Sequence, residues 1–247
     1  MSTEKREASR ICVSVAGGDL ATAVGLARQV EPLADVIEIR LDGIVDPSLP
    51  AFFSSLRCPL LFTNRPTWEG GQHSGPEEER VGLLVEAASA GAAYVDLELL
   101  APAASLKRLR EAVAGTSTRL ILSRHDFSAT PPLAELLDWV KQMHEKGADI
   151  GKVVTTARDH RDVLRVLHLQ EDCAALGLPL IAFCMGRIGL ISRLATIELG
   201  GFMTYCAADG GGSTAPGQIS VAQFRKVCEL LHLRSSSASC VTEPVDG

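Results

Sequence analysis

The feature that most constrains the fold of this sequence is a regular alternation of short β-rich runs with longer segments of helical periodicity. The β-rich runs span residues 11–17, 36–42, 60–65, 94–99, 119–126, 150–157, 179–186 and 202–208. Apolar residues recur at helical spacing in the segments 19–31, 47–56, 76–90, 102–114, 132–146, 159–176, 188–199 and 217–232. Eight units in 247 residues average ~31 residues each, the size of one strand, one helix and two loops. Strict alternation of this kind predicts a parallel sheet.

Two architectures satisfy this alternation: a closed (β/α)₈ TIM barrel and a doubly wound open sheet. In a doubly wound sheet helices cover both faces, so central strands read as nearly continuous apolar runs. The run 36–42 instead places Glu38, Arg40 and Asp42 on one face, because side chains alternate along a strand. Charges are costly to bury beneath helices, but they can line the mouth of a barrel.

A second strand repeats this pattern, with Asp96 and Glu98 on one face. We therefore predict an α/β fold of the (β/α)₈ TIM-barrel type, and the doubly wound sheet is the alternative. Residues 1–233 are expected to form a single catalytic domain. Residues 234–247 are small and polar, which is typical of a disordered tail.

Composition narrows the classes of partner. Hydrophobic residues make up 46% of the chain, which excludes intrinsic disorder. The 24 basic and 30 acidic residues give a net charge of −6, which argues against nucleic-acid and membrane partners. The seven cysteines form no CxxC pair, and neither a targeting signal nor a membrane span is expected. These features favour a cytoplasmic protein that binds a small molecule or a second copy of itself.

Two residues within the predicted strands are candidates for catalysis. Lys152 stands among apolar and β-branched residues, where it could extend toward solvent from a strand end or could be a desolvated amine activated by burial and by neighbouring cations. His125 lies near the carboxyl end of its strand and is either a general acid or base or a structural histidine. No histidine or cysteine has metal-ligand spacing, so we expect no metal site.

Binding candidates are arginines and a glycine-rich segment. Arg40, Arg65 and Arg193 are each expected in or just after a strand or the loop that follows it, so three guanidinium groups would converge on one mouth. Planar guanidinium groups suit a substrate that carries a carboxylate. The segment 209–218 is either a phosphate-binding loop or a mobile lid, and its hinge glycines favour the lid.

Seven motifs in order resemble those of type I 3-dehydroquinate dehydratase over nearly the whole chain. They are EIRLD (38–42), LLFTNRPTWEGG (60–71), YVDLEL (94–99), SRHDFSATP (123–131), GADIGKVV (147–154), MGRIGLISR (185–193) and STAPGQ (213–218). The resemblance implies dehydration of 3-dehydroquinate to 3-dehydroshikimate, the third step of the shikimate pathway, without a cofactor. It also implies a homodimer.

The resemblance also implies roles for individual residues. Lys152 would form an imine with the C3 ketone, His125 would move the protons, and Glu69 would orient His125. Substrate contacts would come from Ser14, Glu38, Arg40, Arg65, Arg193, Thr214 and Gln218. Thr214 stands where many members carry serine, and the run of glycines before it is richer than we expect for the family.

Two other classes of function are compatible with parts of the sequence. A class I aldolase or transaldolase-like barrel also uses a strand lysine and an imine, but it usually needs a phosphate site. A catalytically silent barrel that acts as a binding module is expected to have lost Lys152 or His125, and both are present.

Overall fold

The computed structural model describes residues 9–208 and 219–233, and its main feature is one sheet of eight parallel strands. The strands are β1 (Arg10–Val15), β3 (Val36–Arg40), β5 (Leu60–Thr63), β6 (Tyr94–Glu98), β7 (Arg119–Asp126), β8 (Ile150–Thr156), β9 (Leu180–Met185) and β10 (Met203–Ala207). Their spatial order is β10-β1-β3-β5-β6-β7-β8-β9. The amide of Phe202 donates to the carbonyl of Leu180 over 2.8 Å, so the last gap is bridged and the barrel is nearly closed.

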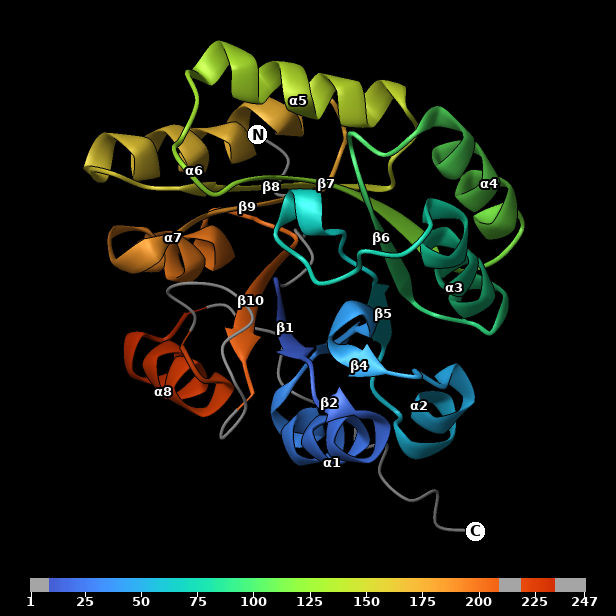
Figure 1. The fold of residues 1–247 in the computed structure, drawn as a ribbon. Helices are drawn as coiled ribbons and strands as arrows, with labels where there is room; N and C mark the ends of the chain where they lie inside the picture. The colour runs from blue at the N-terminus through green and yellow to red at the C-terminus, as the bar shows by residue number, and fades with distance from the viewer. Residues whose placement is uncertain (1–8, 209–218, 234–247) are drawn as a thin grey trace, which may run out of the picture.

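In the described ranges eight α-helices follow the strands, and they form the outer ring of the barrel (Figure 1). They are α1 (Leu20–Val30), α2 (Leu49–Ser55), α3 (Glu77–Ser89), α4 (Ala103–Val113), α5 (Leu133–Glu145), α6 (His160–Ala174), α7 (Gly186–Glu198) and α8 (Val221–Leu231). Side chains cap the N-termini of three of these helices: Asp19, Asp159 and Ser220 each accept a hydrogen bond from a first-turn backbone amide. A small additional sheet pairs β2 (Gly18–Asp19) with β4 (Ile44–Val45).

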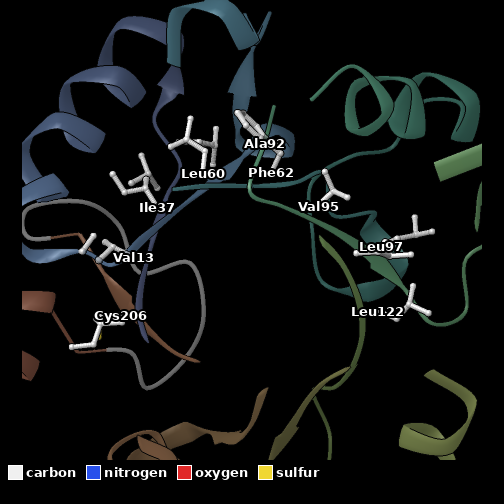
Figure 2. Packing of buried hydrophobic residues seen from close by; sticks show 14 of the residues in the cluster. Val13, Ile37, Leu60, Phe62, Ala92, Val95, Leu97, Leu122 and Cys206 are labelled. Carbon is white, nitrogen blue, oxygen red and sulfur yellow. The ribbon is translucent and has the colours of Figure 1, made fainter. Parts of the chain in front are cut away.

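Alternation along the strands separates two apolar regions. Side chains such as Ile37, Val95 and Leu122 point outward and pack beneath the helices, as Figure 2 shows. Inward-pointing side chains such as Ile121 and Ile181 form a second cluster inside the barrel. Each strand therefore has an apolar outer face, and the inner face is free to carry polar groups toward one end.

The predicted barrel is confirmed, and the doubly wound alternative is wrong. All eight predicted strands and helices are present, with boundaries shifted by a few residues. One detail of the prediction fails: β3 ends at Arg40, and Asp42 lies in the 3-10 turn Leu41–Gly43 instead of sharing the strand face. The predicted lid at 209–218 and the predicted tail at 234–247 lie outside the described residues.

No helix within the described ranges has the length and apolar character needed to cross a membrane.

Candidate active site

Polar side chains from most of the strands meet around one pocket. Its open volume is about 500 Å³, and most of the residues that line it were predicted from the sequence. The predicted lining residues are Ser14, Glu38, Arg40, Arg65, Glu69, His125, Lys152 and Arg193. The predicted contacts Thr214 and Gln218 lie outside the described residues.

Lys152 lies on β8 with its side chain almost fully buried. Its Nζ donates to Asp96 Oδ2 over 2.9 Å and to the hydroxyl of Tyr205 over 3.1 Å, and it lies 3.7 Å from Glu38 Oε1. Its salt-bridge partners are thus two carboxylates, whereas the sequence led us to expect neighbouring cations. The alternative of a lysine extending into solvent is wrong, because the amine is held inside the barrel.

Glu38 is held in place by two hydroxyl groups on neighbouring strands. Thr63 donates to Glu38 Oε1 over 2.8 Å, and Ser14 contacts Oε2. Ser14 and Glu38 are register partners on β1 and β3, so their side chains project side by side into the barrel. This arrangement fixes one carboxylate beside the lysine amine.

Arg65 follows β5 and is buried in a group of carboxylates. Its two terminal nitrogens pair with Asp96 Oδ1 over 2.8 Å and with Glu98 Oε1 over 2.6 Å. It also donates to the hydroxyl of Ser123 over 2.8 Å. Charge-assisted bonds of this kind fix geometry more strongly than neutral ones, so Arg65 holds two strands of the barrel in one arrangement.

The pairing continues on both sides of Arg65. On one side Asp96 reaches Lys152, and on the other Glu98 reaches Arg80 of α3 over 2.8 Å. Burial alone would raise the pKa of Asp96, but Arg65 and Lys152 together lower the pKa below its usual range. Asp96 therefore stays ionised at neutral pH. We name the five residues Arg80, Glu98, Arg65, Asp96 and Lys152 the charge ladder.

His125 and Glu69 form the second chemical element of the site. Glu69 Oε1 lies 2.9 Å from Nδ1 of His125 and accepts its backbone amide over 2.8 Å. Burial lowers the pKa of His125 well below its usual range, and Arg65 and Lys152 lower it further. The imidazole is therefore neutral at neutral pH and can accept a proton. Burial also raises the pKa of Glu69 to about 7.

Two glycines after Glu69 explain the EGG motif. Gly70 has a left-handed backbone with φ of 75°, and a Cβ there would lie 2.3 Å from the Phe127 ring. A Cβ on Gly71 would lie 2.0 Å from the backbone oxygen of Arg65. Only residues without a side chain let this turn fold back on the strand and bring Glu69 to His125.

The other two arginines differ in their partners. Arg40 makes two hydrogen bonds to Asp42, of 2.9 and 2.7 Å, so its charge is balanced locally. Arg193 lies on α7, within the segment 188–199 that was expected to be helical, and is almost fully buried. It stacks on the Phe183 ring at 4.3 Å, while its Nε and Nη2 atoms have no hydrogen-bond partner among the described residues.

Comparisons with known proteins are consistent with this geometry. Residues 11–235 match the family model of Type I 3-dehydroquinase. This chain belongs to the type I 3-dehydroquinase family. It is 50% identical to the 3-dehydroquinate dehydratase of Desulfotalea psychrophila over 218 residues, which cover 88% of this chain and 96% of that protein.

Solved structures of other type I 3-dehydroquinases have the same fold. The Clostridium difficile enzyme, with covalently modified comenic acid, superimposes with a TM-score of 0.83 at 28% identity, covering 91% of this chain and 92% of that one. For 3-dehydroquinate dehydratase of Geobacillus kaustophilus the TM-score is 0.79 at 31% identity, covering 94% of this chain and 92% of that one. The barrel is thus the fold of this family.

Several residues of this type I 3-dehydroquinase site were not predicted from the sequence. Tyr205 stands in an apolar run and gives no polar signal except its inward position in the strand alternation. Arg80 is fully buried but lies in an acid-rich helical segment, which is typical of a solvated face. Phe127 stacks on His125 with ring centroids 6.0 Å apart. Among the described residues, no group of three or more His, Cys, Asp or Glu could hold a metal ion.

Proposed function

We propose that this chain dehydrates 3-dehydroquinate to 3-dehydroshikimate through a Schiff base on Lys152. One observation carries the proposal: a buried lysine amine shares a pocket with a neutral histidine that is hydrogen-bonded to a carboxylate. A nucleophilic amine and a separate base are the two groups that an imine-assisted elimination requires. Family membership identifies the substrate class.

The first step is condensation of the Lys152 amine with the C3 ketone, which releases water. The imine nitrogen carries a positive charge and accepts electrons from the adjacent carbon. The C2 proton then becomes acidic enough for a base of imidazole strength. Asp96 remains ionised beside the nitrogen and stabilises that charge.

His125 moves the protons in the second stage. Its neutral imidazole removes the C2 proton, and the imidazolium then donates a proton to the C1 hydroxyl, which leaves as water. Glu69 accepts from Nδ1, so it fixes the ring and stabilises the imidazolium that forms. Hydrolysis of the imine returns the free lysine and the conjugated enone product.

The remaining pocket residues are proposed to bind the substrate. Arg193 is the strongest candidate for the carboxylate, because its Nε and Nη2 atoms are buried and no described residue forms a hydrogen bond with them. Burial lowers the pKa of Arg193 to about 10, so the group stays charged at neutral pH and gains from an anionic partner. Ring hydroxyls are assigned to Ser14, Glu38, Arg40 and Arg65, and, on the resemblance alone, lid contacts to Thr214 and Gln218.

Borohydride trapping combined with product detection tests the proposal. Purified protein given 3-dehydroquinate should produce the ultraviolet absorbance of the conjugated enone. Borohydride added with substrate should inactivate the enzyme, and peptide mass mapping should place the adduct on Lys152. Lys146 at the end of α5 is the matched control, so Lys146→Ala should trap normally and Lys152→Ala should not trap. Product formation without an adduct on Lys152 contradicts the mechanism.

We further propose that the chain acts in the cytoplasm as a homodimer whose catalytic domain spans residues 1–233. The described cysteines are all buried thiols and none of them forms a disulfide, which suits a reducing compartment. The dimer rests on the family resemblance. Light scattering on the purified protein tests it, and a mass of one chain at micromolar concentration would contradict it.

A further inference from the structure

Within the part of the chain that the structure describes, the Tyr205 hydroxyl is the one polar partner of Lys152 that brings no charge. It lies 3.1 Å from Nζ, and the centre of its ring lies 4.2 Å from the same atom. Asp96 Oδ2 is the other close partner at 2.9 Å, whereas Glu38 Oε1 at 3.7 Å is beyond hydrogen-bond range. Asp96 and Tyr205 therefore occupy two of the three hydrogen directions on the nitrogen.

The hydroxyl of Tyr205 is held in place from several sides. The residue lies in the middle of β10, in register with Cys12 of β1. Its ring packs on Phe183 at 5.8 Å, and its backbone oxygen accepts from Arg193 over 3.4 Å. The side chain is buried, and burial raises the pKa of the phenol well above its usual range. At neutral pH Tyr205 thus presents a neutral hydroxyl oxygen to the amine.

We infer that Tyr205 orients the lysine nucleophile: with Asp96 it holds the two N–H bonds that remain once the Lys152 ammonium has given up a proton for attack, so that the lone pair of Nζ points at the substrate carbon. A neutral amine has two hydrogens and one lone pair, and the two fixed acceptors leave one direction for the lone pair. Nucleophilic attack depends strongly on such alignment. Tyr205 contributes an acceptor without adding a further negative charge beside the amine.

The inference rests on the proposed function of Lys152 and concerns imine formation alone. Once the imine has formed, the nitrogen is bonded to the substrate carbon and its orientation is fixed covalently. Loss of the Tyr205 hydroxyl should therefore slow imine formation and leave proton abstraction by His125 unchanged. General damage to the barrel would slow both steps.

The test variant is Tyr205→Phe, which keeps the ring, its packing on Phe183 and the ring contact with Nζ. Single-turnover reactions quenched with borohydride at increasing times give the rate at which the Lys152 adduct appears, and ultraviolet absorbance gives the rate of product formation from the accumulated imine. We expect imine formation to slow about tenfold, as for loss of one hydrogen bond that orients a reacting group. The control is Tyr94→Phe, which removes the hydroxyl of the only other tyrosine in the chain and should leave both rates unchanged.

A second measurement does not depend on the stability of Tyr205→Phe. In the Tyr94→Phe background Tyr205 is the only tyrosine, so 3-fluorotyrosine labels it alone. Its fluorine resonance should shift when borohydride traps the imine, because one N–H donor to the hydroxyl is then lost or moved.

The outcomes separate the two proposals. If the wild-type chain forms no Lys152 adduct, the proposed function fails. If it forms the adduct and Tyr205→Phe forms it within twofold of the same rate, the inference about Tyr205 is wrong while the proposed function stands. A fluorine resonance unchanged by trapping would also overturn the inference.

Discussion

Replacing Glu69 with glutamine removes one charge from the catalytic pair while keeping its shape. The amide oxygen of Glu69→Gln can still accept from the backbone and Nδ1 of His125, as Glu69 Oε1 does at 2.8 and 2.9 Å. A hydrogen bond to a charged group is worth about 1.5 kcal/mol more than a neutral one, which corresponds to roughly tenfold in rate. We expect turnover at pH 8 to fall about tenfold, because the imidazolium is less stabilised.

The pH profile shows whether the titrating group is Glu69. Its pKa of about 7 means that the carboxylate forms as pH rises through neutrality. If the protonated carboxyl leaves the same tenth of the activity as Glu69→Gln, wild-type kcat/KM should be about fivefold lower at pH 6 than at pH 8. In Glu69→Gln this acid limb should disappear between pH 6 and 8. Persistence of the same limb would refute the assignment.

The same substitution should stabilise the fold, because the raised pKa of Glu69 means that its ionised form destabilises the folded state. Because the folded pKa of about 7 exceeds the ordinary 4.5, the unfolded chain loses the Glu69 proton first, so stability falls as pH rises from about 4.5 to about 7 and levels off above that. The full cost at pH 8 is about 3 kcal/mol. Thermal unfolding of Glu69→Gln should therefore show a gain in Tm over wild type that is larger at pH 8 than at pH 5. Glu79→Gln, at an exposed position in α3, is the control and should show neither effect.

Three further expectations concern His125, the EGG turn and metal ions. His125→Ala should lower turnover by at least ~10²-fold while borohydride still traps the Lys152 imine, and near-normal turnover would make His125 structural. Gly71→Ala should lower stability by about 3 kcal/mol in urea unfolding, because its Cβ would lie 2.0 Å from the Arg65 oxygen. Gly25→Ala, in an open position of α1, should instead gain about 0.5–1 kcal/mol. Prolonged dialysis against EDTA should leave turnover unchanged, since the imine supplies the electron sink, and activity restored by a divalent ion would contradict this.

The barrel could be predicted from the sequence because polar and apolar residues alternate along the strands. This alternation shows that the two faces of a strand lie in different environments. Ile37 and Ile39 point outward and Glu38 points inward, and this difference excludes a sheet covered on both faces. The end of β3 could not be predicted, because Asp42 leaves the strand to pair with Arg40 and to accept the Arg65 amide over 3.1 Å. Whether Asp42 stays in the strand depends on the backbone amide of Arg65, which lies in the loop after another strand.

The site could be predicted as a set of residues but not as a set of contacts. From the sequence Arg65 is a cation at a strand end, available to an anion. In the structure its partners Asp96 and Glu98 come from the next strand, 31 and 33 residues away, and they neutralise it. Tyr205 was missed because its role depends on one oxygen lying beside Lys152, and no local pattern encodes that distance.

The charge ladder also separates the response of this protein to ionic strength into two parts. Its five members are buried, so mobile ions cannot approach the pairs closely, and screening there is weak. An anionic substrate approaching the pocket from solvent is screened within a Debye length of about 8 Å at physiological salt. Added salt should thus slow capture of the substrate while the chemical steps at Lys152 proceed at their normal rate. Burying the ladder gives the reaction an electrostatic environment that is set by the protein and not by the surrounding electrolyte.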